Sequence, residues 1–143
     1  MKYKTIIKED IEERVEIYAK SRTKLIEQIE SLCENDEIEL VGYFEDESCL
    51  INVNEIQRIY IENDKTYVSL DDKTYRVKYR LYQLEEIVTD DFIKINQSCL
   101  ININYISKFK TSWGGSLLVQ LKNGGVDYVS RRQTKVVKER MGI

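Results

Sequence analysis

Residues 92–106 combine a strongly apolar sequence with a dense set of uncharged hydrogen-bonding side chains. One parity of the segment is apolar, as in a half-buried strand, and holds Ile93, Ile95, Cys99, Ile101 and Ile103. The segment is long for one strand, and its Asn, Gln and Ser side chains favour a turn or a helix cap. It therefore predicts a strand at 92–96, a tight or helical turn at 97–103 and a second strand at 105–110. Lys94, Asn96 and Gln97 would then project from a strand end.

Further strands are predicted on both sides of this segment. Runs rich in Tyr, Val, Ile and Thr alternate with polar turns, at residues 56–61, 66–70, 74–79, 117–121 and 126–129. Apolar residues at helical spacing predict a short helix at 81–89, and a basic helix at 131–141 follows Ser130 as its N-cap. The predicted fold class is β-rich α+β, with antiparallel sheets and short helices.

The first 51 residues predict a β-β-α extension that leads into more strands. Short strands are expected at 3–7 and 14–19, and an amphipathic helix at 22–34 begins after Ser21 as its N-cap. Strands at 38–44 and 49–53 follow. Because no proline-rich linker follows, we expect this extension (1–51) to dock on the main domain (52–143).

Charge is distributed unevenly along the chain. Residues 1–51 hold 7 Lys and Arg against 14 Asp and Glu, a net −7, whereas residues 52–143 hold 15 against 11, a net +4. Residues 94–143 contain 9 basic residues and only 2 acidic ones. A basic end of this kind provides the charge that phosphate binding requires, although a solvated face with an incidental bias would show the same pattern.

The residue content argues against metal, cofactor and enzyme chemistry. Three cysteines at 33, 49 and 99 form no close pair, which is typical of reduced thiols in the cytoplasm. Histidine is absent, so we expect neither a zinc site nor a cofactor. No phosphate-binding glycine loop or nucleophile motif predicts an enzyme. The N-terminus lacks a signal-peptide core, and no window is long enough to span a membrane, so we expect a cytoplasmic protein without membrane insertion.

Two ordered motifs carry a family resemblance. The first is F-x-K-x-N-x-S-x-x-I-N, from Phe92 to Asn102, and the second is V-S-R-R at residues 129–132. Together they resemble the LytTR-type DNA-binding domain of bacterial transcription regulators over residues 56–140. Family members usually carry F-x-R-x-H-x-S-x-x-V-N, so Lys94 and Asn96 depart from the commonest residues.

The resemblance implies an elongated stack of antiparallel sheets that binds double-stranded DNA through loops and strand ends, without a helix-turn-helix recognition helix. The matching DNA-facing positions would be Asp64, Lys65, Lys94, Asn96, Gln97, Arg131 and Arg132. Arg can fork onto guanine, Asn or Gln onto adenine, and Lys can neutralise phosphate, whereas Asp64 fits neither base nor phosphate well.

Each of these assignments has a structural alternative. Ser98 and Asn102 are expected to satisfy the backbone of a buried polar turn. Arg131 and Arg132 could decorate a helix N-terminus, yet positive charge there opposes the helix dipole unless an anion lies opposite.

Two functions are considered for the whole chain. The first is a sequence-specific DNA-binding regulator of transcription, which is expected to bind repeated half-sites as a homodimer. The alternative is an interaction module or antagonist that keeps the fold without acting on DNA. Residues 1–51 are too short for a receiver domain, so control is expected from abundance, self-association or a regulatory protein partner.

Overall fold

The computed structural model describes residues 2–12, 14–34 and 38–143. The chain divides into an N-terminal unit, Met1–Asp36, and a strand unit, Glu37–Ile143. In the parts of the chain that the structure describes, no helix has the length and apolar character needed to cross a membrane.

The N-terminal unit contains the helix α1 (Lys24–Glu34), which confirms the amphipathic helix expected there. Its cap is Thr23 rather than Ser21, because the Thr23 Oγ1 accepts a hydrogen bond from the Ile26 N–H at 3.3 Å. The strands expected at residues 3–7 and 14–19 are wrong, since no described residue of these segments pairs in a ladder. Alternating apolar residues form a strand only where a neighbouring backbone satisfies their N–H and C=O groups.

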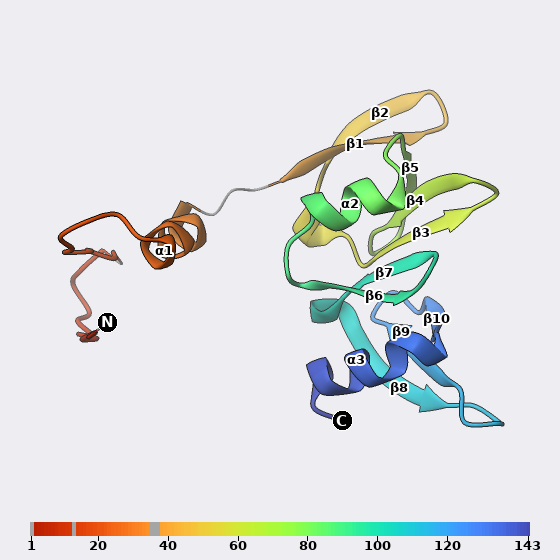
Figure 1. The fold of residues 1–143 in the computed structure, drawn as a ribbon. Helices are drawn as coiled ribbons and strands as arrows, with labels where there is room; N and C mark the ends of the chain where they lie inside the picture. Colours follow the sequence, from red (N-terminus) through yellow and green to blue (C-terminus); the bar gives the residue numbers. More distant parts are fainter. Residues whose placement is uncertain (1, 13, 35–37) are drawn as a thin grey trace. The chain divides into compact units, whose positions relative to one another are not determined.

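The strand unit contains two antiparallel sheets (Figure 1). The larger sheet has the strand order β2-β1-β5-β4-β3-β7-β6. Its strands are β1 (Glu39–Phe44), β2 (Glu47–Asn52), β3 (Arg58–Glu62), β4 (Lys65–Ser69), β5 (Thr74–Val77), β6 (Phe92–Asn96) and β7 (Cys99–Asn102). The smaller sheet has the order β10-β9-β8, with β8 (Ile106–Thr111), β9 (Leu117–Leu121) and β10 (Val126–Val129). The predicted fold class of antiparallel sheets with few short helices is confirmed.

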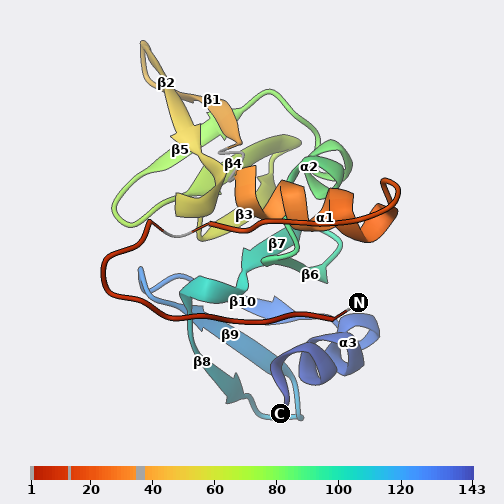
Figure 2. The ribbon, with the colours of Figure 1, turned by 90° about the vertical axis from the view of Figure 1, so that its left-hand side faces the viewer.

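Two α-helices and two 3-10 turns complete the strand unit. The helices are α2 (Leu81–Ile87) and α3 (Arg131–Met141), and they lie toward the same side of the sheets (Figures 1 and 2). The 3-10 turns are η1 (Val53–Glu55) and η2 (Ile103–Tyr105). Both helices begin close to their predicted first residues.

The segment after β6 differs from its prediction. The tight or helical turn expected at residues 97–103 is interrupted: Gln97 and Ser98 turn, and Cys99–Asn102 then form β7, which returns antiparallel to β6. The 3-10 turn comes later, at η2. The other edge of β7 pairs with β3, where Tyr60 lies opposite Cys99. This partner is distant in the sequence, so local pattern could not show that the segment is a strand.

The strands β1 and β2 belong to the strand unit, whereas the sequence predicts an extension that ends at residue 51. β1 pairs with β2 along its length and meets β5 at Tyr43 and Arg76. The division between compact units lies at Asp36 and Glu37. A boundary after residue 51 would cut through β2.

One topology occurs twice in the strand unit. The first repeat (residues 38–88) runs β1-β2-η1-β3-β4-β5-α2, and the second repeat (residues 91–141) runs β6-β7-η2-β8-β9-β10-α3. The first and last strands of each repeat are also neighbours. β1 pairs with β5 in the first repeat, and in the second the Ser130 N–H, just after β10, donates a hydrogen bond of 2.8 Å to the Ile95 C=O of β6. The sequences of residues 48–56 and 98–106 are identical at seven of nine positions.

Each repeat encloses its own apolar core. The first core includes Ile59 and Leu84, and the second includes Val119 and Val137. Leu100 of β7 packs into the first core although it belongs to the second repeat. The two repeats are therefore joined both by backbone pairing and by an exchanged apolar side chain.

Candidate nucleic-acid interface

Three polar loops follow or precede paired strands, and backbone hydrogen bonds hold two of them against neighbouring strands. The Ser98 C=O, in the β6–β7 turn, accepts a hydrogen bond from the Ile61 N–H of β3 at 3.0 Å. The Ser130 N–H, just before α3, donates to the Ile95 C=O of β6. The third loop connects the paired strands β3 and β4. We call residues 63–65, 97–98 and 130–132 the loop surface.

The β3–β4 loop is a two-residue turn. Asn63 and Asp64 have φ values of 50° and 60°, which are left-handed conformations that Asn and Asp tolerate. Turn geometry therefore accounts for Asp64 without a DNA contact. Lys65 begins β4 opposite Glu62, and its side chain is exposed. Its role as a phosphate contact stays a prediction.

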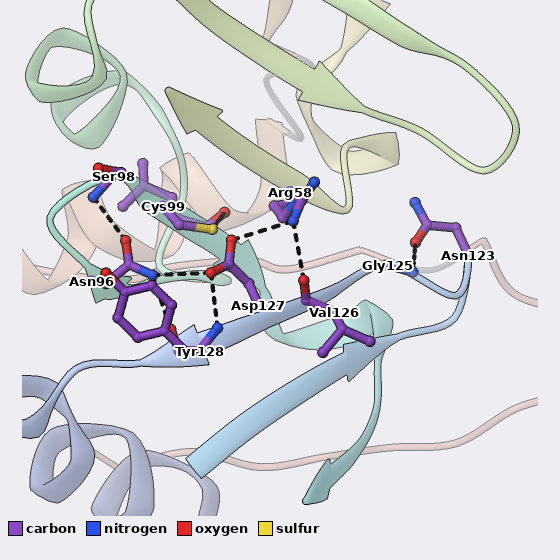
Figure 3. A network of polar contacts seen from close by, with 10 residues as sticks. Arg58, Asn96, Ser98, Cys99, Asn123, Gly125, Val126, Asp127 and Tyr128 are labelled. Atoms are coloured by element: carbon purple, nitrogen blue, oxygen red, sulfur yellow. Dashed lines mark hydrogen bonds and ion pairs between the residues drawn. The ribbon is translucent and has the colours of Figure 1, made fainter. Parts of the chain in front are cut away.

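Asn96 lies inside the molecule rather than on the loop surface. Only 2% of it is exposed. Its Nδ2 donates to the Asp127 Oδ1 at 3.2 Å and to the Tyr128 C=O at 2.9 Å, and its Oδ1 accepts from the Ser98 N–H at 2.8 Å (Figure 3). These bonds use the amide to attach the β6–β7 turn to β10. We therefore remove Asn96 from the proposed DNA contacts and assign it a structural role.

Asp127 organises the polar network behind the loop surface (Figure 3). Its Oδ2 lies 3.2 Å from the Arg58 Nη1, and the two side chains are 19% and 20% exposed. The Arg58 guanidinium also stacks on the Tyr60 ring, 4.1 Å from its centroid. Because Arg58 belongs to β3 and Asp127 to β10, this partly buried ion pair links the two sheets.

Cys99 is enclosed by the same network. Burial raises the pKa of its thiol well above the usual range, and the charge of Asp127 raises it further while Arg58 opposes the shift. A thiol in this environment stays protonated and reacts slowly. Cys33 and Cys49 are instead exposed.

Gln97 and Ser98 occupy the exposed tip of the β6–β7 turn. The Gln97 carboxamide can offer both a donor and an acceptor to an adenine edge. Ser98 contributes through its backbone, since its N–H binds Asn96 and its C=O binds Ile61. The structural role predicted for Ser98 therefore involves the main chain.

Asn102 is the structural side chain at the other end of β7, and it is 1% exposed. Its Oδ1 accepts from the Asn104 N–H at 3.0 Å, which caps η2. Its Nδ2 donates to the Ile56 C=O at 3.0 Å, across the junction of the two repeats. Asn102 therefore satisfies backbone groups in both repeats.

Lys94 lies in β6 beside α2. Its Nζ is 3.7 Å from a carboxylate oxygen of Glu85, and each side chain is 36% exposed. A shallow groove of about 550 Å³ is lined by Lys94 together with Asp64, Arg80 and Gln97. The groove thus brings together residues from three separate segments.

Lys94→Ala is expected to weaken binding to all DNA duplexes, with a salt dependence shallower by about one unit, because one phosphate contact is lost. The measurement is a titration of labelled duplex at several salt concentrations. Glu85→Ala is the matched control, since it removes the carboxylate that competes for Lys94 and should strengthen binding. A Lys94→Ala protein that keeps the full salt dependence would show that Glu85 already neutralises this lysine.

Arg131 and Arg132 occupy the first turn of α3, and both are exposed. Their side chains form no ion pair or hydrogen bond with the residues that the structure describes. The helix continues with three further basic residues and Glu139, which gives it a net charge of +4. Two unpaired cations at the positive end of a helix are unfavourable unless an anion approaches.

A second basic segment was not predicted from the sequence. Arg76, Lys78 and Arg80 alternate along β5 and the residues before α2, and all three are exposed. They line a hollow with Lys65, and Arg80 also lines the groove beside Lys94. The signal was present as R-V-K-Y-R. It corresponds in the first repeat to the strand–helix junction that carries Arg131 and Arg132 in the second.

Comparison with known proteins identifies the family of the chain. A family model described as the LytTr DNA-binding domain matches residues 46–142. The chain belongs to the LytTR DNA-binding domain family. The match begins earlier than residue 56, where the resemblance in the sequence starts, and so includes β2.

Relatives and a solved structure extend the comparison. Uncharacterized HTH-type transcriptional regulators from Staphylococcus aureus strains NCTC 8325 and COL are each 34% identical over 104 residues, covering 73% of this chain and 71% of the relative. A LytTr DNA-binding domain from Bacillus cereus has a TM-score of 0.68 at 22% identity, covering 73% of this chain and 97% of that domain. This last likeness concerns the fold.

No helix-turn-helix is found in the described part of this LytTR-family chain. Five strands separate α2 from α3, and α1 is followed by strands. Exposed basic and amide groups lie on the loop surface, which includes the first turn of α3, and on the basic segment before α2.

Proposed function

We propose that this LytTR-family chain is a sequence-specific double-stranded DNA-binding regulator of transcription that contacts DNA through the loop surface and through Arg80 and Lys94 of the adjoining groove. The observation that carries the proposal is the family match over residues 46–142. The names of the Staphylococcus aureus relatives, which describe transcriptional regulators, support it.

The proposed contact residues are Lys65, Lys94, Gln97, Arg131 and Arg132, with Arg80 added from the structure. Arg131 and Arg132 have the guanidinium geometry for guanine, and Gln97 has the carboxamide for adenine. Lys65, Lys94 and Arg80 would neutralise phosphates and set the register on the duplex. Lys94 exchanges its contact with Glu85 for a phosphate in this scheme.

We further propose that two copies bind repeated half-sites in the cytoplasm. The loop surface is small, so one copy reads a short sequence that occurs many times in a genome. A second copy bound at the neighbouring half-site raises the specificity, because it binds at a high effective concentration. A regulatory protein partner remains a prediction from the sequence.

Selection of bound sequences from random duplex DNA tests this function. The expected result is an enriched motif repeated at a spacing of about one or two helical turns. The affinity for the selected duplex should fall steeply with salt. Retention of DNA without any enriched motif would indicate non-specific binding, and no retention at low salt would favour an interaction module that acts through proteins.

A further inference from the structure

The two repeats of this chain meet along one antiparallel strand pair. β3 of the first repeat pairs with β7 of the second, with Ile59 opposite Leu100 and Tyr60 opposite Cys99. The Ile61 N–H donates to the Ser98 C=O, and the Asn102 N–H donates to the Gln57 C=O, each at 3.0 Å. We call this pairing the internal seam.

Among the described residues, each strand of the internal seam has a counterpart in the other repeat that is paired along one edge only. β8 occupies in the second repeat the place of β3, and β2 occupies in the first repeat the place of β7. β2 and β8 are edge strands among the described residues, and they lie at opposite ends of the strand unit (Figures 1 and 2). An edge strand presents unpaired backbone groups to which another strand can add.

The side chains that close the internal seam are uncovered in these counterparts. Leu100 is 2% exposed, whereas Leu50, at the same place in β2, is 68% exposed. Ile59 is fully buried beside Leu100, whereas its counterpart Phe109 in β8 is only partly buried. Leu50 on the β2 edge and Phe109 on the β8 edge therefore correspond to Leu100 and Ile59, which pack against each other in the internal seam.

The cap residue of β2 also matches that of β7. The Asn52 Oδ1 accepts from the Asn54 N–H at 2.9 Å, as Asn102 does for Asn104. The Asn102 Nδ2 additionally donates across the internal seam to Ile56. The place of Ile56 is taken by Ile106 in the second repeat. A strand added to β8 could therefore receive the same cross-seam hydrogen bond.

We propose that copies of this chain associate head to tail, with β2 of one copy pairing with β8 of the next in the register of the internal seam. Leu50 then lies opposite Phe109, Cys49 opposite Lys110, and Ile51 opposite Lys108. The Asn52 amide donates to the Ile106 C=O of the next copy. The partner is a second copy of this chain because the internal seam already pairs these strand types in this register.

Charge favours the head-to-tail arrangement over pairing of like edges. The segment Glu39–Asn52 holds Glu39, Glu45, Asp46 and Glu47 and no basic residue. β8 holds Lys108 and Lys110 and no acidic residue. Two β2 edges or two β8 edges would repel each other, whereas β2 and β8 attract. In the proposed register Lys110 lies diagonal to Glu47, on the same face of the sheet.

Such an interface is heterologous, so each added copy leaves one β2 edge and one β8 edge free. The association does not depend on DNA binding. Its test can therefore be made without DNA, and its failure would leave the DNA-binding proposal untouched.

Disulfide trapping tests the proposed register. In the internal seam the pair Tyr60–Cys99 falls between the hydrogen-bonded positions 61/98 and 57/102 and is itself not hydrogen-bonded. Such pairs have Cα atoms about 4.5 Å apart, within the range of a disulfide. Cys49 is exposed and lies opposite Lys110 of the next copy. In the full chain carrying Cys33→Ser, Lys110→Cys is expected to give dimers, trimers and longer products on a non-reducing gel after mild oxidation at raised protein concentration.

Two control variants make the outcome decisive. Adding Cys49→Ser should abolish the ladder, and Lys108→Cys, which lies opposite Ile51, should form it far less efficiently. Cys99 is buried and should not compete. The proposal is overturned if Lys110→Cys yields only monomers. Monomers are also the expected result if another segment of the same chain covers β8. Dimers that persist with Cys49→Ser would equally overturn it, because they would join two β8 edges.

Discussion

Asn102→Ala is expected to lower the free energy of unfolding by about 2–4 kcal/mol, whereas Asn52→Ala is expected to lower it by about 1 kcal/mol. Both asparagines cap a 3-10 turn through Oδ1. Only Asn102 also satisfies a buried carbonyl, that of Ile56 in the other repeat. Truncation at 102 therefore loses the cap and leaves a buried acceptor unpaired, while truncation at 52 loses the cap alone.

Urea denaturation of the two variants and the parent chain measures this difference. Substitution by Asp separates the two contributions further, because Asp keeps the capping oxygen but removes the Nδ2 donor. Asn52→Asp should be close to neutral, since Asp is a good cap. Asn102→Asp should be strongly destabilising, because it buries a carboxylate against a carbonyl. Equal effects at both positions would show that the bond across the repeats contributes nothing.

Local patterns were sufficient for much of the strand unit. β9, β10 and their glycine turn followed from alternation and turn residues, and α3 began after Ser130 as predicted. β7 was missed because its second partner is β3, far earlier in the chain. The strands predicted at residues 3–7 and 14–19 were wrong for the opposite reason, because apolar and polar residues alternate there but no neighbouring strand pairs with them. In each case the presence or absence of a pairing strand determined whether the segment formed a strand, and sequence periodicity does not show which segments pair.

The exposure of candidate interface residues was predictable from the sequence at turns, but not at the β-bulge in β6. Gln97, Arg131 and Arg132 are exposed as expected. Asn96 was expected beside them because it lies on the polar parity of β6. A register shift between Lys94 and Asn96 breaks that alternation, and both Ile95 and Asn96 become buried. No single-residue property of Asn96 distinguishes it from an exposed asparagine.

Repetition explains why basic residues occur at two separate places. In each repeat the last strand leads directly into a helix, from β5 to α2 and from β10 to α3. Arg80 marks the first junction and Arg131 and Arg132 mark the second. The second junction is joined to β6 by the Ser130 hydrogen bond. This bond fixes the start of α3 on the sheet, as base reading requires.

Arg132→Ala is expected to weaken binding to the selected duplex by about 1–3 kcal/mol and to relax the preference at one base position. The Arg132 side chain is exposed in the first turn of α3, whose start is fixed against β6. Arg132→Lys should recover little of the loss, because lysine keeps the charge but lacks the planar fork that reads guanine. Fluorescence anisotropy with the selected and a scrambled duplex measures both effects.

Lys138→Ala is the matched control for charge, since it removes one cation from the last turn of the same helix. It should change binding to the selected and scrambled duplexes by similar small amounts. If Arg132→Ala also weakens both duplexes equally, Arg132 contacts phosphate and does not read a base. If the folded variant binds the selected duplex as the parent does, Arg132 lies outside the interface, and base recognition at this junction would have to come from Arg131.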